Sequence, residues 1–337
     1  MMYSGIDLHS NNSVVAIIDD ADRVVAQKRL PNDITKIVGF LSRWKDELAG
    51  VVVESTYNWY WLVDGLQDAG HNVHLANTAA IKQYDGLKHS GDETDAQHLA
   101  HLLRLDILPT GTILPREHRA VRDLARKRMQ LVRSSTTHVL AVENIMARQL
   151  GARMTSNETK RLTVDAVDKL PLAADVRLAI KANVAVIAAL RAQIELLEMR
   201  LKERVKPRPE YGLLTSVPGI GQALATVIFL ETGPINRFAD VGNYASYARC
   251  VDSVHTSNRK KKGEGNVKNG NKYLAWAFVE AANFARRFCA EAKRFHERKK
   301  AKTNNVVATK ALAHKLARAC YHILKEGKPF DVTRCFA

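Results

Sequence analysis

The first 110 residues constrain the fold most, because they alternate between strand and helix patterns in one order. Three β-rich runs, "YSGIDLHS", "NSVVAIIDD" and "RVVAQKRL", are separated by the turn-prone segments "SNN" and "DDAD". A helical stretch at about residues 34–48 precedes a short, buried-type strand, "GVVVES". A helix through "NWYWLVDGLQDAG", a strand "NVHLA" and helices through "AAIKQYDGL" and "DAQHLAHLLRL" follow. The pattern predicts a mixed sheet, with an antiparallel meander joined to parallel strands through helical crossovers.

That order of elements is the order of an RNase H-like domain, so the sequence predicts an α/β domain over residues 1–110. Long helical patterns over about 114–206 predict a helical spacer, here taken as residues 111–206. The prolines of "KPRPE" end that pattern, and a mainly α-helical domain is expected over 207–337.

Four acidic residues fall where such a domain would place an active site. Asp7 lies in the first predicted strand, and Glu54 ends the fourth. Asp92 and Asp95 lie three residues apart at the start of a predicted helix, so they share one face. Each acid alone is typical of a cap or a solvated surface. Together they predict an oxygen-ligand site for one or two Mg²⁺ ions, which would hold a scissile phosphate.

The charge of the chain is divided unevenly. Residues 1–110 hold 9 Lys and Arg against 15 Asp and Glu, a balance of −6, so the total of +16 leaves +22 for the remainder. A segregated basic excess indicates a nucleic-acid partner, because cations that contact phosphates release counterions. A generally basic protein is the alternative.

A heptad-like apolar seam runs through the second half of the spacer. Its steps of 4 and 3 residues are typical of a coiled coil, and its one polar member would fix register. The pattern favours self-association, as a dimer to tetramer, over an intramolecular helical hairpin that packs the same stripe. The seam residues are Val176, Ile180, Asn183, Ile187, Leu190, Ile194, Leu197 and Leu201.

Two elements of the last domain suggest contacts with DNA. The turn Pro218-Gly219-Ile220-Gly221 separates two apolar helical stretches and resembles a helix–hairpin–helix motif, in which free N–H groups hold a phosphate. A plain helix–turn–helix connection fits the same spacing. The phosphate-binding candidates are Pro218, Gly219 and Gly221 in that turn, and Arg259, Lys260, Lys261, Lys262 and Lys268 in the densest basic segment.

Ser257 stands directly before those cations, in "HTSNRKKKGEGNVKNGNKYL". A serine can act as a nucleophile when a base accepts its proton and cations stabilise the developing charge. A surface loop is the simpler interpretation, and Thr256 and Ser253 are alternative nucleophiles.

The whole chain resembles the transposases of the "one-ten" insertion-sequence family, especially its "eleven-eleven" branch. The resemblance rests on "GIDLHS", "VVVEST", "GDETDAQ", "VPGIGQALA" and the serine segment. It implies a RuvC-like DEDD domain whose Asp7, Glu54, Asp92 and Asp95 bind Mg²⁺, a coiled-coil linker and a C-terminal transposase domain.

The same resemblance implies that Ser257 attacks DNA and forms a covalent 5′-phosphoserine intermediate. It also implies a tetramer whose acidic domain completes the serine site of another subunit, and a noncoding bridge-type RNA that pairs with donor and target DNA. Relatives usually carry glycine after the serine, whereas Asn258 follows it here, and Asn tolerates positive φ. Ser90-Gly91 replaces the Lys-Thr that often precedes the third acid.

Two other functions fit the sequence. A RuvC-like nuclease would hydrolyse DNA with water and leave no protein–DNA adduct, and a basic binding protein would carry acids without a metal role. No apolar run approaches the ~20 residues of a membrane span, and no secretory leader is visible, so a cytoplasmic protein is expected. Cys250, Cys289, Cys320 and Cys335 show no metal-like spacing and are expected to be free thiols.

Overall fold

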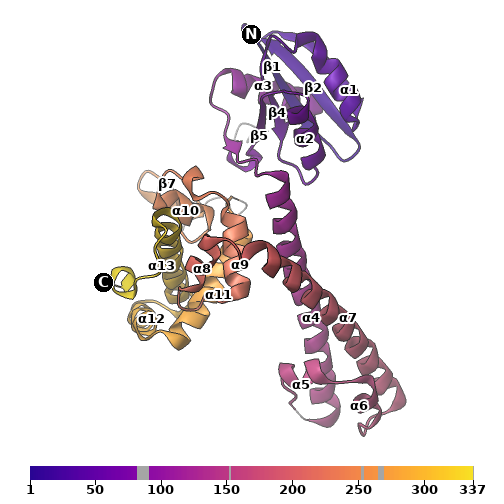
Figure 1. Ribbon diagram of the computed structural model, residues 1–337, viewed down its shortest axis with the longest axis vertical. Helices are drawn as coiled ribbons and strands as arrows, with labels where there is room; N and C mark the ends of the chain where they lie inside the picture. The colour runs from indigo at the N-terminus through magenta and orange to yellow at the C-terminus, as the bar shows by residue number, and fades with distance from the viewer. Residues whose placement is uncertain (82–90, 152, 252–253, 265–268, 337) are drawn as a thin grey trace. The chain divides into compact units, whose positions relative to one another are not determined.

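The computed structural model describes residues 1–81, 91–151, 153–251, 254–264 and 269–336 (Figure 1). The chain forms two compact units, one of residues 1–116 with 253–269 and one of residues 117–252 with 270–337. None of the described helices combines the length and the apolar character needed to cross a bilayer.

The first unit is built on a mixed six-stranded sheet in the order β3-β2-β1-β4-β5-β6. β1, β2 and β3 form the antiparallel meander, β1, β4 and β5 are parallel, and β6 pairs antiparallel with β5. The predicted mixed α/β sheet is therefore confirmed, and the short β6 is an addition. The strands are β1 (Met2–Leu8), β2 (Asn12–Asp19), β3 (Val24–Pro31), β4 (Leu48–Glu54), β5 (Val73–Ala76) and β6 (Thr110–Gly111).

Helices cover both faces of this sheet. α1 (Ile34–Leu41) and α2 (Tyr60–Asp68) pack with Ile6 and Leu8 of β1 on one face. α3 (Asp92–Arg104) packs on the other face, where Ala96 contacts Val14 and Ala16 of β2. Since side chains alternate along a strand, Asp7 points to the α3 face.

The helix expected over residues 34–48 is shorter in the structure. Asp33 caps α1, which ends at Leu41, and the 3₁₀ turn η1 (Ser42–Trp44) leads into β4. A second 3₁₀ turn, η2 (Thr78–Ala80), occupies the start of the predicted helix "AAIKQYDGL". The rest of that prediction, after residue 81, lies outside the described residues, as does Ser90.

Gly5 lets α3 approach β1 closely. A Cβ atom at Gly5 would lie 2.0 Å from the backbone oxygen of Ala96 and 2.8 Å from the nitrogen of Ala100. No side chain at this position can therefore coexist with α3 in its present place. The first glycine of "GIDLHS" thus fixes the distance between the strand that carries Asp7 and the helix that carries Asp92 and Asp95.

Gly5→Ala is expected to destabilise the first unit by about 1–3 kcal/mol, the usual cost of overpacking a core. Because α3 must shift, the variant should also weaken any metal binding that needs acids from both elements. Urea unfolding with and without Mg²⁺ measures both effects. Gly39→Ala is the control, since a Cβ there meets nothing within 4 Å. Equal unfolding of Gly5→Ala and the parent chain would contradict the close approach.

The second unit is helical in its described residues, apart from a few turns. Its largest core gathers apolar residues of α4, of α7 and of the helices from α8 to α13. The helices are α4 (Arg116–Leu150), α5 (Ser156–Arg161), α6 (Val164–Asp168), α7 (Ala174–Val205), α8 (Pro209–Thr215), α9 (Gln222–Thr232), η3 (Ile235–Arg237), α10 (Val241–Tyr247), α11 (Lys272–Phe288), α12 (Ala290–Lys302), α13 (Asn305–Glu326) and α14 (Val332–Phe336).

The heptad seam lies on α7, which runs beside α4 (Figure 1). Ile180, Val184 and Ile187 are buried against residues of α4 such as Val142. Asn183, the polar member of the seam, accepts through its Oδ1 from Nδ1 of His138 in α4 at 2.9 Å. This half of the seam therefore forms the intramolecular hairpin that the sequence offered as the alternative. Self-association through the remaining seam residues stays a prediction.

Candidate metal centre and serine hairpin

The four predicted acids come from three neighbouring elements of the first unit. Asp7 and Glu54 lie near the carboxyl ends of the adjacent parallel strands β1 and β4, where Ile6 pairs with Val53. Asp92 and Asp95 lie in the first turn of α3, on the face of the sheet to which Asp7 points. Coulombic interactions connect Asp7 with both of them, and Glu54 with Asp95. The structure thus brings the predicted set together.

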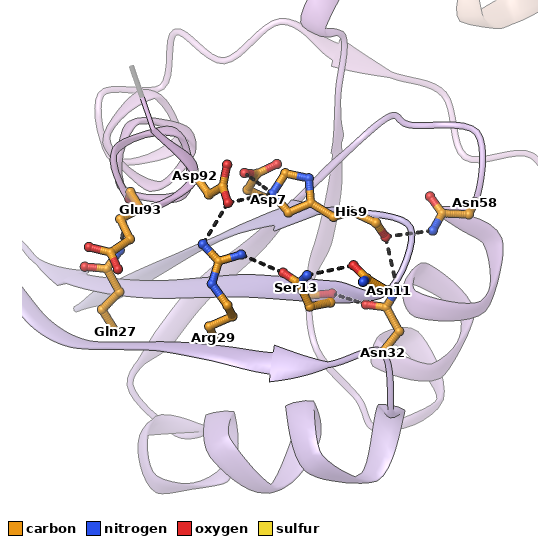
Figure 2. Close-up of polar contacts among 11 residues, drawn as sticks. Asp7, His9, Asn11, Ser13, Gln27, Arg29, Asn32, Asn58, Asp92 and Glu93 are labelled. Carbon is orange, nitrogen blue, oxygen red and sulfur yellow. Dashed lines mark hydrogen bonds and ion pairs between the residues drawn. The ribbon is translucent and has the colours of Figure 1, made fainter. Parts of the chain in front are cut away.

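His9 is a member of this cluster that the sequence interpretation missed. Its Nε2 lies 3.2 Å from Asp7 Oδ2 and 3.2 Å from Asp92 Oδ2 (Figure 2). Ligand atoms of Asp7, His9 and Asp92 all lie within 4.8 Å of one another, a spacing that could hold a metal ion. The period-2 relation of Asp7 and His9 was the available signal, since residues i and i+2 of an extended chain share a face.

Arg29 of β3 neutralises part of the acidic charge. Its Nη2 donates to Asp92 Oδ2 at 2.7 Å, and its Nη1 donates to Asn12 at 2.8 Å (Figure 2). This hydrogen bond from Arg29 lowers the pKa of Asp92 below its ordinary value. The carboxylate of Asp92 is therefore ionised and held at the rim of the site.

Two buried carboxylate oxygens show that the cluster suits a divalent cation. Asp7 is only 4% exposed, and its buried Oδ2 has His9 Nε2 at 3.2 Å but accepts no hydrogen bond. The buried Oδ1 of Asp95 also accepts no hydrogen bond from any described residue. Burial raises the pKa of Asp7. Burial, and then the hydrogen bond with Asp7, raises the pKa of Glu54 to about 8. Such a set is costly unless protons or a cation neutralise it, and clustered carboxylates are the ligands that Mg²⁺ prefers.

Metal-free protein is expected to lose stability as the pH rises from about 4.5 to about 8. Over that range folded Glu54 keeps the proton that its unfolded form releases, so the folded state binds more protons. One such proton gives a slope of at most about 1.4 kcal/mol per pH unit. Urea unfolding in EDTA at pH 5 and pH 8 measures this loss, which Glu54→Gln should reduce. An equal change in stability between pH 5 and pH 8 in the parent chain and in Glu54→Gln would contradict a protonated Glu54.

Ser257 lies in a β-hairpin, whereas the sequence predicted a loop. β7 (Val254–Ser257) pairs antiparallel with β8 (Lys260–Glu264), and Ser257 is the register partner of Lys260. Asn258 and Arg259 form the two-residue turn, with φ of 50° and 60°. Two positive φ values are typical of a type I′ turn. The turn therefore survives without glycine, as the tolerance of Asn for positive φ suggested.

This turn presents Ser257 to solvent among cations. Ser257, Thr256, Arg259, Lys260 and Lys262 are all exposed. The backbone of Lys261 pairs with Thr256 in the hairpin. Lys268 and the alternative nucleophile Ser253 lie outside the described residues. The hairpin is thus able to bring a hydroxyl and several positive charges to one phosphate.

The chain leaving the serine segment is held by a buried polar network. Asn271 donates from Nδ2 to Glu231 at 2.7 Å, and its Oδ1 accepts from the backbone nitrogens that begin α11. Glu231 is 3% exposed and accepts two hydrogen bonds from Arg126 of α4, at 2.6 and 2.8 Å. The backbone nitrogen of Asn271 donates to Tyr247 at 2.6 Å. Asn271, at the start of α11, is therefore fixed by side-chain and backbone hydrogen bonds within the second unit.

The PGIG turn joins α8 to α9, as predicted, and its two glycines differ in role. Gly219 has φ of 87°, and a Cβ there would lie 2.3 Å from the backbone oxygen of Ala281 in α11. Gly219 is thus required for packing. Gly221 precedes α9 with nothing within 4 Å of its Cβ position, and Pro218 is half-buried. Only Gly221 leaves open space in which a phosphate could approach.

Two family models of known proteins match parts of this chain. A family model for DEDD transposases of the IS110 type, described as "Transposase", matches residues 4–149. A second, described as "Transposase IS116/IS110/IS902 family", matches residues 211–297. The first match contains all four acids, and the second contains the PGIG turn and Ser257.

One curated relative is the Insertion element IS110 uncharacterized 43.6 kDa protein of Streptomyces coelicolor. It is 23% identical over 146 residues, which are 43% of this chain and 36% of the relative. The chain thus matches about a third of that relative's length. With family models matched in both halves, the chain belongs to the IS110 family of transposases.

Proposed function

We propose that this chain is an insertion-sequence transposase that cuts and rejoins DNA by serine recombination assisted by Mg²⁺. The observation that carries the proposal is the convergence of Asp7, Glu54, Asp92 and Asp95, two of them with buried carboxylate oxygens, in a chain that belongs to this family. The sheet order of the first unit supports an RNase H-like, RuvC-like domain over residues 1–110. The spacer 111–206 and the transposase domain 207–337 complete the proposed organisation.

The acids and the hairpin have separate roles in this proposal. Asp7, Glu54, Asp92 and Asp95, with His9 beside them, would hold Mg²⁺, which supplies a positive charge to neutralise a phosphate. Ser257 attacks the scissile phosphorus: the Oγ–P bond forms, the bond to the 3′ oxygen breaks, and the released DNA end gains a proton as a 3′-hydroxyl. Its exposure at the turn and its pairing with Lys260 support this role.

Rejoining reverses the same step. A 3′-hydroxyl of another strand attacks the phosphoserine, the new P–O bond forms, and the Ser257 hydroxyl is regenerated. Because the 5′-phosphoserine bond retains the energy of the broken phosphodiester, no ATP is needed. The proposed contacts with the DNA backbone are Arg259, Lys260, Lys261, Lys262 and Lys268, and Gly221 in the turn that Pro218 and Gly219 begin.

A guide RNA, assembly into a dimer or tetramer and action on the nucleoid in the cytoplasm are proposed on the resemblance alone. The test is a denaturing-gel assay with end-labelled element-junction DNA, Mg²⁺ and RNA transcribed from the flanking DNA. A protease-sensitive protein–DNA adduct is the expected result. Mg²⁺-dependent cleavage without any adduct would overturn serine recombination.

A metal-dependent nuclease is the second candidate. The gathering of Asp7, His9 and Asp92 at one possible metal site favours it, because cleavage by water at such a site would need no residue of the serine hairpin. It predicts the same loss of cleavage in Asp7 variants but no dependence on Ser257.

A further inference from the structure

Two phenylalanine rings stand in solvent at the end of α11. Phe288 is 77% exposed and Phe284 is 40% exposed, although both are large and apolar. They lie four residues apart, so they share one face of the last turn. The guanidinium of Arg287 lies 5.8 Å from the centroid of the Phe284 ring. An apolar patch of this kind, bordered by charge, marks a binding surface.

The fold of the second unit does not need these rings. The buried face of α11 consists of Leu274, Phe278 and four alanines, all of them fully buried. Ala281 and Ala285 lie against the backbone of Gly219. Since helical neighbours are three or four residues apart, Phe284 and Phe288 lie beside that contact rather than within it. The two rings therefore border the proposed backbone-binding turn.

The charge around the rings selects the partner. Residues 284–302 hold 8 Lys and Arg against 2 Glu, a balance of +6. On α12, Glu291 pairs with Arg294 and Glu297 pairs with Lys300, so both acids are already engaged. Lys293, Arg298, Lys299 and Lys302 are exposed on the same helix. This excess fits a polyanion better than a protein surface.

We propose that Phe284, Arg287 and Phe288, with the cations of α12, form a platform that binds unpaired nucleotides. Every base has a flat face that stacks on an aromatic ring, but a duplex hides those faces between neighbouring pairs. The cations of α12 contact the phosphates that connect the stacked bases. RNA and single-stranded DNA share this chemistry. The proposal uses the proposed function only in taking a nucleic acid as the ligand.

Fluorescence anisotropy of the full-length chain tests the platform. The probes are a labelled 15-mer of oligo(U), a labelled 15-mer of oligo(dT) and a duplex of the same length. The double variant Phe284→Leu/Phe288→Leu keeps apolar bulk but removes the rings, and should weaken binding of at least one single-stranded probe about 10-fold or more. Duplex binding should change less than twofold. The ratio of the two single-stranded affinities identifies RNA or DNA as the source of the nucleotides.

Two controls separate stacking from other effects. Leu196→Ala removes an exposed apolar side chain of the same unit and should leave all three affinities unchanged. Lys299→Gln/Lys302→Gln should reduce the salt dependence of single-strand binding, which the Phe variant should leave unaltered.

Two results would overturn the platform. The first is that the Phe variant binds the single-stranded probes with an affinity within twofold of the parent chain. The second is that the variant has a lower sedimentation mass but unchanged affinities, since the rings would then be a contact between copies of this chain. Ser257→Ala should bind all three probes as the parent does, so failure of the serine chemistry and failure of the platform remain distinguishable.

Discussion

Ser257→Ala is expected to abolish the covalent protein–DNA complex, with a loss of at least about 1,000-fold in strand exchange. Alanine has no Oγ, so the serine–phosphorus bond cannot form, and rejoining has no intermediate to start from. Because Ser257 is exposed and ends β7, the substitution should change the free energy of unfolding by about 0.5 kcal/mol or less. The measurement is the adduct band on a denaturing gel before and after protease treatment.

Thr256→Ala is the matched control for this prediction. Thr256 is a neighbouring exposed hydroxyl on the same strand, and its register partner is Lys261 instead of Lys260. It should form the adduct at the parent level. Loss of the adduct in Thr256→Ala together with its persistence in Ser257→Ala would assign the nucleophile to Thr256. Equal cleavage without an adduct in both variants would support the nuclease.

The sheet and its acids were predictable because both follow local rules. The alternation of apolar residues around Asp7 and the apolar run before Glu54 predict strands from the local sequence alone. The ends of adjacent parallel strands must meet at one edge, which brings Asp7 and Glu54 together. Asp92 and Asp95 required only that their helix cross the sheet, and Gly5 is the residue that permits that crossing.

The parts that escaped prediction depend on contacts distant in the sequence. His9 joins the site only because Asp92, 83 residues later, comes within 3.2 Å of it. The serine hairpin was missed because its turn is Asn258-Arg259, and an arginine with positive φ is a rare choice. A positive φ at such a residue costs of order 1 kcal/mol. Because the residues of this turn do not favour its conformation, their identity does not predict a hairpin.

The heptad seam shows a different limit of sequence analysis. The spacing of apolar residues shows that a helix has an apolar stripe, but it does not show which other helix packs on that stripe. Here α4 of the same chain covers Ile180 and Ile187, and His138 satisfies Asn183. About half of the apolar stripe, although its spacing is typical of oligomers, is therefore buried within an intramolecular hairpin. Leu190, Ile194 and Leu197 are the half-buried seam residues at which the prediction of self-association remains open to test.

Asp7→Asn is expected to act in opposite directions on stability and on cleavage. In metal-free protein it removes a buried charge from a crowd of carboxylates, so the free energy of unfolding should stay equal or rise by about 1 kcal/mol. With Mg²⁺ present, the variant should lose the added stability that a bound ion gives the parent chain. Cleavage should fall at least about 1,000-fold, while salt-sensitive DNA binding persists, because the basic surfaces are unchanged.

Urea unfolding with and without Mg²⁺ measures the effect on stability, and a cleavage assay measures the effect on activity. Asp46→Asn is the control, because Asp46 is an exposed acid of the same unit. Asp46→Asn should match the parent chain in every measurement. If Asp7→Asn instead destabilised the metal-free protein, Asp7 would be a structural residue and loss of cleavage would follow from unfolding. A functional carboxylate is distinguished by that sign: its charge lowers the stability of the empty site, and only the ligand that it binds offsets the cost.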